Sequence, residues 1–308
     1  MRVLVMGGTR FIGVYLTKIL VEQGHQVTLF NRGNNPAPAG VRVITGDRTK
    51  PADLKDKLGK ENFDVIYDNN GRELSDTQPL VDLFQGRIEK FIYMSSAGVY
   101  LKTDQPPHKE GDAVDPKSRH KGKHDTETYM ASCSYLPWTS LRPTYIYGSQ
   151  NYNPLESWFF DRLVRDRPIP IPGHGQHITQ LGHVQDLAVA MAKVLDHDAK
   201  GQIYNVSGDR YVTFDGLAKA CAVAAGKDPE SLKIIHYDPK AYDFGKRKAF
   251  PLRPQHFFCD ISKAQQELNW QPQYDLTRGL KESFQNDYLV TKAGEIDFSV
   301  DEEILATI

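Results

Sequence analysis

Three polar residues between positions 95 and 123 have types that could take part in acid–base chemistry. Ser95 and Ser96 end an apolar run that begins at Phe91, and Lys123 lies on a later segment. A tyrosine four residues before such a lysine would share a helical face with it and could carry a proton. Arg119 occupies that position instead. Because a guanidinium stays protonated, Arg119 cannot take the role of a phenol.

Two histidines near the lysine offer another route for protons. His120 precedes Lys123 by three residues, and His124 follows it directly. An imidazole can accept or donate a proton near neutral pH. Neither histidine shares the helical face of Lys123. We therefore expect both to be solvated side chains at the start of a helix. The candidate catalytic set is therefore Ser96, Lys123, Arg119 and His120.

A glycine-rich turn, residues 7–13, joins an apolar run at 2–6 to a segment with helical spacing at 11–23. The backbone N–H groups at such a junction suit a pyrophosphate. Arg10 stands where a glycine would let the pyrophosphate approach the backbone, so it either narrows the site or supplies a charge. A tight turn without a ligand is the alternative. The candidate contacts are Gly7, Thr9, Arg10, Phe11, Ile12 and Gly13.

Residues after the next two strands bear on which dinucleotide would bind. Asn31 and Arg32 stand where an acidic residue would hold the ribose hydroxyls of NAD. An arginine there suits a 2′-phosphate, so we expect NADP if a dinucleotide binds, with a surface arginine as the alternative. Asp47 suits an adenine amino group or, equally, a cap for the helix that starts near Pro51.

These residues need a scaffold of alternating strands and helices. Apolar runs at 2–6, 26–30, 41–45, 63–67, 90–94 and 139–142 alternate with helical patterns at 11–23, 50–57 and 75–85. The alternation predicts an α/β fold, a doubly wound parallel sheet with helices on both faces. Such a sheet binds ligands at the carboxyl ends of its strands.

The composition changes after Tyr147 and Gly148. Residues 151–175 are rich in proline and aromatic residues and are expected to be loop-rich, as is 236–258. Helices are predicted at 183–195, 214–225 and 262–268, and a strand at 203–206. We expect a Rossmann-like domain over 1–150 with 176–206, a smaller C-terminal α/β substrate-type domain over 151–175 and 207–295, and a tail over 296–308.

The bulk composition is that of a globular protein: of 308 residues, 40% are hydrophobic and 25% charged. The net charge of −1 means that any nucleic-acid affinity must come from local patches. Three widely spaced cysteines indicate a reducing compartment and buried thiols, and no metal-ligand spacing is present. No apolar run is long enough for a membrane span, and with a strand starting at Arg2 no leader is expected.

Two basic stretches are candidates for nucleic-acid contacts. Residues 117–124 hold four permanent cations and two histidines, and residues 245–248 lie between aromatic residues. Cations interleaved with aromatic rings suit phosphates and unstacked bases. A charge run is usually a solvated face, but we expect these two stretches to face one cleft. The candidate RNA contacts are Arg119, Lys121, Lys123, Lys246, Arg247, Lys248 and Arg253.

Longer segments resemble a known family. Residues 91–100 (FIYMSSAGVY), LRP at 141–143, HVQDLA at 183–188 and WQP at 270–272 resemble landmarks of the extended short-chain dehydrogenases/reductases, the sugar-nucleotide epimerase and dehydratase group. In that group Ser96 would orient a substrate hydroxyl and Lys123 would be the lysine of the Tyr–Lys pair. GGTRFIG, KSRHKGK, SLRPTYIYG, NYNPLESWFF, DFGKRKAFP and QHFF together resemble the chloroplast stem-loop-binding proteins and their cyanobacterial relatives, in particular the "b" branch.

This resemblance implies binding of plastid or bacterial transcripts, endoribonuclease activity, and association with ribosomal or transcription complexes. It also implies a chloroplast stroma or a cyanobacterial cytoplasm as the location. Pairing of helices 123–132 and 75–85 between subunits, as in many relatives, would give a homo-oligomer.

Three functions stay open at this point. The first is RNA binding with or without nuclease activity, using His120, Lys123 or His183 without a metal, or a divalent metal near Asp47 and Asp186. For His183 and Asp186, anchoring a loop and a helix start is the alternative. The second function is that of a sugar-nucleotide epimerase, dehydratase or reductase with another proton carrier. The third is a catalytically silent scaffold. Arg119 and the two basic stretches favour the first.

Overall fold

The computed structural model describes residues 1–291 and 294–307, and contacts divide the chain into two compact units. Unit 1 comprises residues 1–144, 184–207 and 259–271, and unit 2 comprises residues 145–183, 208–258 and 272–308.

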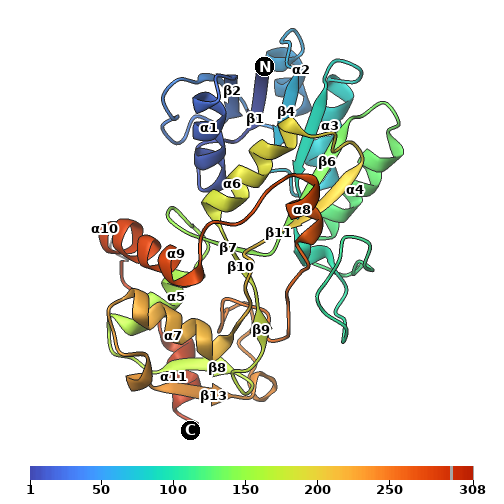
Figure 1. The fold of residues 1–308 in the computed structure, drawn as a ribbon. Helices are drawn as coiled ribbons and strands as arrows, with labels where there is room; N and C mark the ends of the chain where they lie inside the picture. The colour runs from blue at the N-terminus through green and yellow to red at the C-terminus, as the bar shows by residue number, and fades with distance from the viewer. Residues whose placement is uncertain (292–293, 308) are drawn as a thin grey trace. The chain divides into compact units, whose positions relative to one another are not determined.

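Unit 1 is built on one parallel sheet, which confirms the doubly wound α/β fold (Figure 1). Neighbouring strands pair in parallel throughout. In spatial order the strands are β11 (Gln202–Val206), β6 (Trp138–Pro143), β5 (Lys90–Met94), β4 (Val65–Asp68), β1 (Arg2–Met6), β2 (Gln26–Asn31) and β3 (Arg42–Thr45). The central strands are apolar because helices cover both of their faces.

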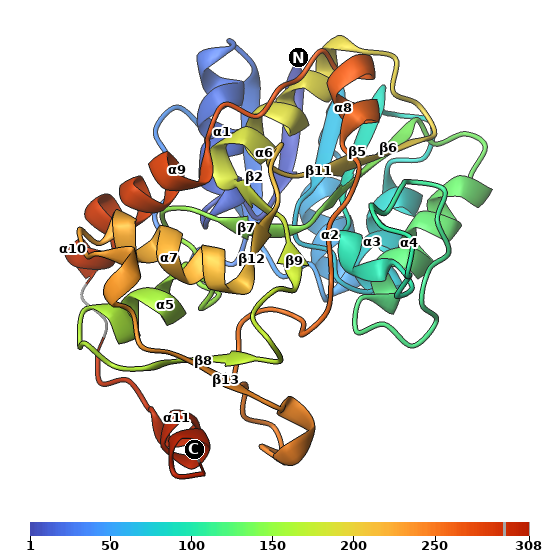
Figure 2. The same cartoon turned by 60° about the horizontal axis from the view of Figure 1, so that its bottom comes forward.

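The helices of unit 1 pack in pairs on the two faces of this sheet. Helix α1 (Ile12–Glu22) contacts α6 (Val184–Lys193), and α3 (Leu74–Leu83) contacts α4 (Lys121–Ser132). Figure 2 shows these two pairs on opposite sides of the strands. Gly24, at a φ of +80°, takes the left-handed conformation that ends α1. The remaining helices are α2 (Pro51–Leu58), α8 (Ser262–Glu267), η1 (Ala97–Val99) and η2 (Val194–Asp196).

Unit 2 has its own core, in which Phe159 and Phe214 are fully buried and pack near Phe250. Its strands form three short pairs: β7 (Tyr145–Tyr147) with β10 (Leu181–His183), β8 (Ile169–Pro172) with β13 (Ile234–Tyr237), and β9 (Ile178–Thr179) with β12 (Val212–Thr213). Its helices are α5 (Glu156–Leu163), α7 (Phe214–Ala224), η3 (Pro229–Ser231), η4 (Pro239–Ala241), α9 (Leu276–Ser283), η5 (Phe284–Tyr288), α10 (Leu289–Thr291) and α11 (Ser299–Leu305).

Two segments expected to be loops contain regular structure. The polar residues of helix α5 do not mark a solvent-exposed face, because Glu156, Asp161 and Arg162 are all buried. Strand β8 reads Ile-Pro-Ile-Pro and pairs on one side only, which is where a strand tolerates proline. Strand β13 and helix η4 occupy part of 236–258.

The division into units differs from the expected boundaries at several places. Residues 145–150 and 176–183 belong to unit 2, because β7 and β10 pair with each other rather than with the large sheet. Residues 259–271 belong to unit 1, where α8 contacts β11. The expected tail over 296–308 contains α11, whose Ile304 is fully buried.

Two further expectations concern the cysteines and the membrane. Cys133, Cys221 and Cys259 are buried free thiols. Among the described helices, none has both the length and the apolar character that a bilayer crossing needs.

Candidate functional site

The glycine turn has the backbone conformation that a phosphate-binding turn needs. Gly7 and Gly8 lie at φ values of +96° and +88°, which glycine adopts without strain. A Cβ on Gly8 would come within 2.6 Å of the Leu29 side chain, and a Cβ on Gly13 within 2.8 Å of the Gly8 backbone. These contacts hold the start of α1 tightly against β1 and β2. Phe11, also at positive φ, is buried, so its ring anchors the turn.

The side chain of Asn31 forms hydrogen bonds to the backbone of the turn and of the loop after β2. The Asn31 side-chain amide donates to the Gly7 carbonyl at 3.3 Å and accepts from the Gly33 N–H at 2.8 Å. Asn31 is thus part of the turn's framework. The side chains of Arg10 and Arg32 are exposed, while Thr9 and Ile12 are half-buried. The turn therefore fits a pyrophosphate through its backbone, with exposed guanidinium groups on Arg10 and Arg32.

Asp47 orders the connection between β3 and α2. Its carboxylate accepts from the Thr49 N–H at 3.0 Å and from the Thr49 hydroxyl at 2.8 Å. These hydrogen bonds hold the pKa of Asp47 below its usual value. The residue before the helix is Lys50, so Asp47 stabilises the turn without being the N-cap itself.

A buried ion pair that sequence reasoning did not single out lies between these loops. The Arg48 guanidinium donates to both carboxylate oxygens of Asp68, at 2.6 and 2.9 Å, and to the Asp76 carbonyl at 2.7 Å. It also donates to the Asn70 side chain. Burial would raise the pKa of Asp68, but Arg48 and the Thr77 hydroxyl keep it below its usual value. The sequence does contain a signal for this pair: Asp68 ends the apolar strand β4, and a buried carboxylate needs a cation as partner.

Ser96 and His120 meet at Gly98. The Ser96 hydroxyl accepts from the Gly98 N–H at 3.0 Å. A Cβ on Gly98 would lie 2.4 Å from the His120 ring and 3.0 Å from the Ser96 hydroxyl, so only glycine lets the three groups approach. Ser118 fixes the loop, because its hydroxyl donates to the Gly98 carbonyl at 2.7 Å and accepts from the His120 N–H at 3.0 Å.

His120 and His124 are both half-buried, so they are less exposed than expected, although 35% of the His124 side chain is still exposed. The packing on Gly98 encloses His120, whereas His124 lies 3.9 Å from the carboxylate of Glu127. The reason is tertiary, because the loop before α4 folds back over η1.

Arg119 lies before the first turn of α4, not within it. Its guanidinium is exposed, and its Nε donates to Nε2 of His120 at 3.1 Å. An imidazole nitrogen that accepts this bond carries no proton, so the ring proton then resides on Nδ1. The pairing places a fixed positive charge directly against the imidazole.

Lys123 points into unit 1 rather than out to solvent. Its ammonium donates to the carbonyl of Met94, the last residue of β5, and lies 5.0 Å from the centre of the Tyr93 ring. Burial lowers the pKa of Lys123 to about 8, although the nearby Asp68 opposes the change. The ammonium of Lys123 is therefore tied to the end of β5, and a phosphate would have to compete with the Met94 carbonyl for it.

A second buried ion pair, between Glu127 and Arg142, joins α4 to β6. Glu127 accepts from the Ser140 hydroxyl at 2.6 Å and from the Arg142 guanidinium at 2.7 Å. Burial would raise the pKa of Glu127, but His124, Arg142 and Ser140 together lower it to about 2. Arg142 belongs to the LRP segment, whose arginine is thus a structural partner of the helix that carries Lys123.

The two basic stretches belong to different units. In unit 1, Lys117, Arg119 and Lys121 are exposed, and Lys121 pairs with Asp125 one turn along α4. In unit 2, Lys246 is exposed, while Arg247 forms two hydrogen bonds to Glu303. A shared cleft for both stretches stays a prediction.

The last two basic candidates of unit 2 contact their own loop. Lys248 donates to the Pro251 carbonyl at 2.8 Å, and the Arg253 guanidinium lies 5.0 Å from the centre of the Phe257 ring. Both contacts order the segment between β13 and α8.

His183 and Asp186 both lie in buried surroundings. The His183 ring stacks on Tyr274 with 3.6 Å between ring centres, and burial lowers its pKa to about 4. Asp186 is buried near the start of α6, and its carbonyl accepts from the Trp270 ring nitrogen at 3.0 Å. In the described part of the chain, no three His, Cys, Asp or Glu side chains are grouped in a way that could hold a metal ion.

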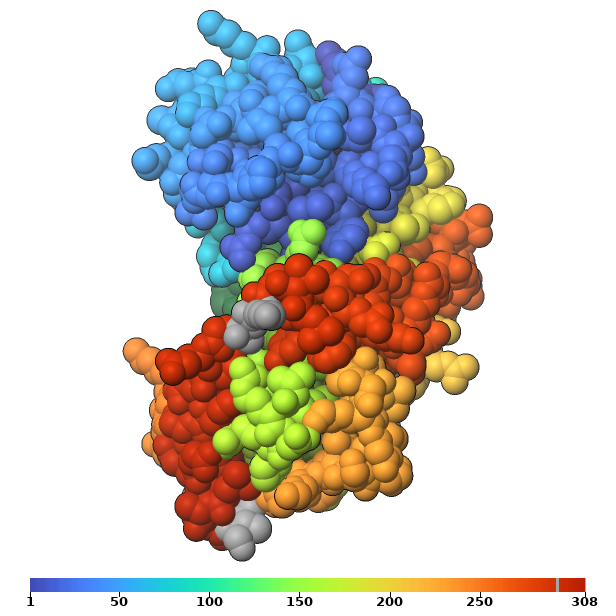
Figure 3. Space-filling view, turned by 90° about the vertical axis from the view of Figure 1, so that its left-hand side faces the viewer, coloured from blue at the N-terminus to red at the C-terminus, as the bar shows by residue number. Residues whose placement is uncertain are grey.

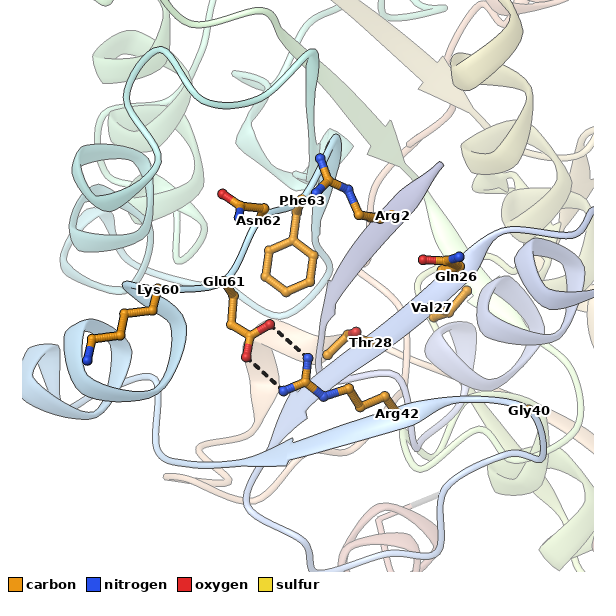
Figure 4. A pocket seen from close by; sticks show the side chains of 10 residues that line it. All are labelled: Arg2, Gln26, Val27, Thr28, Gly40, Arg42, Lys60, Glu61, Asn62 and Phe63. Atoms are coloured by element: carbon orange, nitrogen blue, oxygen red, sulfur yellow. Dashed lines mark hydrogen bonds and ion pairs between the residues drawn. The ribbon is translucent and has the colours of Figure 1, made fainter.

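A separate cavity opens at the amino ends of the parallel strands, where β1 and β2 begin (Figure 4). Its volume is about 520 Å³, and an ion pair between Arg42 and Glu61 crosses one wall with two bonds of 2.7 Å. The cavity is lined by Arg2, Gln26, Val27, Thr28, Gly40, Arg42, Lys60, Glu61, Asn62 and Phe63. None of these is a predicted site residue.

Comparison with known proteins identifies the family. A model described as "NAD(P)H-binding" matches residues 7–155, and one described as "GDP-mannose 4,6 dehydratase" matches residues 162–283. The chain is 50% identical to the "Chloroplast stem-loop binding protein of 41 kDa b, chloroplastic" of Arabidopsis thaliana, over 99% of this chain and 84% of that protein. The chain belongs to the chloroplast stem-loop binding protein family.

More distant relatives of this stem-loop binding family member are sugar-nucleotide enzymes. A "Putative UDP-glucose 4-epimerase" of Methanocaldococcus jannaschii is 24% identical over 91% of this chain and 96% of its own length. The solved UDP-glucose 4-epimerase of Thermotoga maritima superposes with a TM-score of 0.78 at 20% identity, over 93% of this chain and 99% of its own. The family member therefore has the fold of the extended short-chain dehydrogenases/reductases.

Proposed function

We propose that this protein binds RNA stem-loops on an extended short-chain dehydrogenase/reductase scaffold that no longer transfers hydride. The observation that carries the proposal is the 50% identity, over nearly the whole chain, to a protein named for binding stem-loops. Arg119, in the place of the proton-carrying tyrosine, supports it from the chemistry of the site.

The geometry around Arg119 and Lys123 argues against a working proton relay. A relay needs a group that can lose a proton next to the lysine. The guanidinium of Arg119 points instead to His120, and the ammonium of Lys123 is directed to a backbone carbonyl. His120 is the remaining acid–base group, and its Nε2 accepts a hydrogen bond from the Arg119 guanidinium.

The oxidoreductase alternative rests on the glycine turn together with Ser96 and Lys123. If a dinucleotide binds, Gly7, Gly8 and Gly13 would cradle its pyrophosphate, and Arg10 with Arg32 would favour the extra phosphate of NADP. The bound cofactor would supply hydride transfer. We expect the protein with NADP⁺ neither to change the nicotinamide absorbance nor to convert UDP-glucose into another sugar nucleotide, whereas steady turnover of UDP-glucose would overturn the proposal.

The exposed cations Arg119, Lys121, Lys246 and Lys248 are proposed to contact phosphates. Each would release counterions from the RNA, so binding should weaken steeply with salt. Lys123 is not among the proposed contacts, because its side chain is half-buried and its ammonium is held by the Met94 carbonyl. Arg253 is proposed as a stacking partner for an unpaired base, beside Phe257.

The test is the affinity for a fluorescent stem-loop RNA between 50 and 200 mM salt, roughly the range over which phosphate contacts are lost. The change is R119Q/K121Q/K246Q/K248Q. We expect weaker binding and a salt dependence that is shallower by about 0.7 for each contact that is lost.

The matched control is K18Q/K55Q/K60Q/K200Q, which changes the net charge equally at four other exposed lysines. If both quadruple variants bind like the wild type, the proposed contacts are wrong. If the wild type itself fails to bind any stem-loop, the proposed function fails.

Cleavage of the bound RNA is a finer proposal. His120, beside Ser96 and Gly98, is the candidate acid–base group. Asp47 and Asp186 lie on separate segments, and neither belongs to a group of three possible metal ligands among the described residues. We expect cleavage, where it occurs, to be lost in H120N with binding retained. Comparison of Mg²⁺ with EDTA would show whether a divalent metal takes part.

Location and partners follow from the relative's name rather than from geometry. We propose the plastid stroma or its cyanobacterial equivalent, because the relative is named as chloroplastic. A homo-oligomer formed through α3 and α4, and association with ribosomal or transcription complexes, are further proposals. Light scattering with and without RNA would test the first.

A further inference from the structure

Three consecutive acidic residues near the C-terminus each bind a different arginine of unit 2. Asp301 accepts from Arg162 at 2.6 Å. Glu302 accepts from Arg167, and both oxygens of Glu303 accept from Arg247, at 3.0 Å for the Oε2 bond. These acids lie on α11, and Figure 3 shows the C-terminal residues, in dark red, against the yellow-green surface of α5.

Two of these arginines, Arg162 and Arg167, gather with Arg165 around one aromatic ring. The guanidinium carbon of Arg167 lies 4.2 Å from the centre of Phe298, that of Arg162 lies 5.4 Å away, and that of Arg165 lies 5.9 Å away. Such a concentration of like charge needs counter-charge, which α11 supplies. Arginines that present a planar fork are also the side chains that best bind phosphate oxygens in pairs.

The three ion pairs differ in burial. One is buried, and the other two are open to water, so another anion could replace their glutamates; we call these two exchangeable. The side chains of Arg162 and Asp301 are 5% and 2% exposed, and with the fully buried Ile304 they anchor α11. Arg167 and Glu302 are 26% and 62% exposed, and Arg247 and Glu303 are 44% and 46% exposed. Ion pairs in contact with water are weak and are screened by salt. Glu302 and Glu303 can therefore release their arginines while α11 stays docked.

Two aromatic residues lie close in sequence to Arg247, which forms one of the two exchangeable pairs. The rings of Tyr242 and Phe244 stack with 5.3 Å between their centres, three to five residues before Arg247. Tyr242 also hydrogen-bonds to Thr307, just after α11. Guanidinium groups next to stacked aromatic rings suit a strand of RNA, whose phosphates and bases need both. This combination favours RNA over a simple anion.

We propose that Glu302 and Glu303 act as phosphate substitutes that occupy Arg167 and Arg247 until RNA phosphates displace them. The acidic face of α11 then lowers the affinity of unit 2 for RNA and sets a threshold for binding. This inference rests on the proposed RNA-binding function and adds a mode of regulation to it.

The test compares E302Q/E303Q with the wild type in binding a fluorescent single-stranded RNA and a stem-loop RNA. Glutamine keeps the shape and can still accept from arginine, but it no longer neutralises the positive charge. We expect affinity to rise roughly tenfold at about 50 mM salt, and the salt dependence to steepen by about 1.4 for two additional phosphate contacts.

The matched control is E22Q/E230Q, which removes the same charge from two exposed glutamates that pair with lysines. Its affinity should stay near that of the wild type. In the E302Q/E303Q background, R167Q/R247Q should abolish the gain. The single variant E303Q, which changes one side chain of α11, should show part of it.

Each result separates the two proposals. Wild-type binding with no gain in E302Q/E303Q or E303Q overturns the masking inference and leaves the proposed function standing. An equal gain in E22Q/E230Q also overturns it, because general charge then explains the effect. If no variant binds either RNA, the proposed function and the inference both fail.

Discussion

The ammonium of Lys123 donates a hydrogen bond to the carbonyl of Met94, at the carboxyl end of β5. This contact ties α4 to the sheet at the point where Ser95 and Ser96 leave it. It also means that Lys123 holds its charge in a poorly hydrated place, which lowers its pKa to about 8. The contact has a measurable consequence for stability.

The first prediction is that Lys123 makes the folded protein more stable as the pH rises from about 8. An unfolded lysine keeps its proton to about pH 10.5, so between these values the unfolded state binds more protons and stability increases with pH. Below pH 8 the full cost of burying the charge remains. The difference between the two pKa values corresponds to about 3 kcal/mol.

Urea unfolding of the wild type and of K123M, from about pH 7.5 to 9.5, isolates this contribution. The wild type should gain about 2 kcal/mol relative to K123M over that range. K121M, at an exposed lysine on the same helix, should follow the wild type. Parallel pH profiles for all three proteins would show that Lys123 is hydrated in solution.

The second prediction concerns the buried pair of Arg48 and Asp68. Replacement of Arg48 by methionine leaves the Asp68 carboxylate buried with only Thr77 and the Gly71 N–H as donors. Loss of one partner of such a pair costs about 3–5 kcal/mol, measured as the free energy of unfolding in urea.

Controls separate this cost from a general effect of arginine. R42M removes an exposed pair with Glu61 and should leave the unfolding midpoint close to that of the wild type. The double variant R48M/D68N should lose less than the sum of its single variants, because the two sites are in contact. Additive losses would contradict the pairing.

The sequence predicted the elements of unit 1 well because their determinants are local. Apolar runs that meet glycines, such as Leu4 to Met6 before Gly7, define buried parallel strands without knowledge of the rest of the chain. The resemblance to the family was equally local, since it rested on motifs within those elements.

Other features could not be predicted because they depend on distant residues. Nothing around Lys123 in sequence indicates burial, since its neighbours are mainly charged or polar, and only the fold brings Met94 and Tyr93 to it. Helix α11 appeared as a tail because its acids suggest solvent exposure, whereas their arginine partners lie more than fifty residues away. Long-range charge pairing is what a pattern of single residues does not reveal.

The third prediction concerns the close approach of α3 and α4 at Gly122. A Cβ there would lie 2.7 Å from the Arg72 carbonyl and 2.1 Å from the Glu73 carboxylate. Helix propensity alone would make G122A more stable by about 1 kcal/mol. We expect the backbone clash to outweigh this gain and to lower the free energy of unfolding by about 1–3 kcal/mol.

Gly111 provides the control for this substitution. A Cβ on Gly111 would have no neighbour within 4 Å, so G111A should leave stability nearly unchanged. A G122A protein as stable as G111A would mean that α3 and α4 can separate without cost. In that case the loop at 117–120, which precedes α4, would be less firmly positioned than its contacts indicate.

The last prediction concerns Glu156, the first residue of α5. Its carboxylate accepts from the Gly148 N–H at 2.8 Å, the Asn151 amide at 2.9 Å and the Ser283 hydroxyl at 3.1 Å, with no cation among these partners. Burial outweighs these bonds and raises the pKa of Glu156 to about 7. The unfolded state releases the proton first, so stability should fall as the pH rises from about 4.5 to 7 and then level off.

The size of this fall is about 3 kcal/mol, and it should be absent from E156Q, whose amide does not titrate. Urea midpoints of E156Q and the wild type should therefore change differently between about pH 5 and 8. The wild-type midpoint should fall as Glu156 loses its proton, and the E156Q midpoint should not show this fall. E230Q, at an exposed glutamate, should keep the wild-type profile. A wild-type profile for E156Q would show that Glu156 is already charged at pH 5, with water reaching α5 from the loop at 148–155.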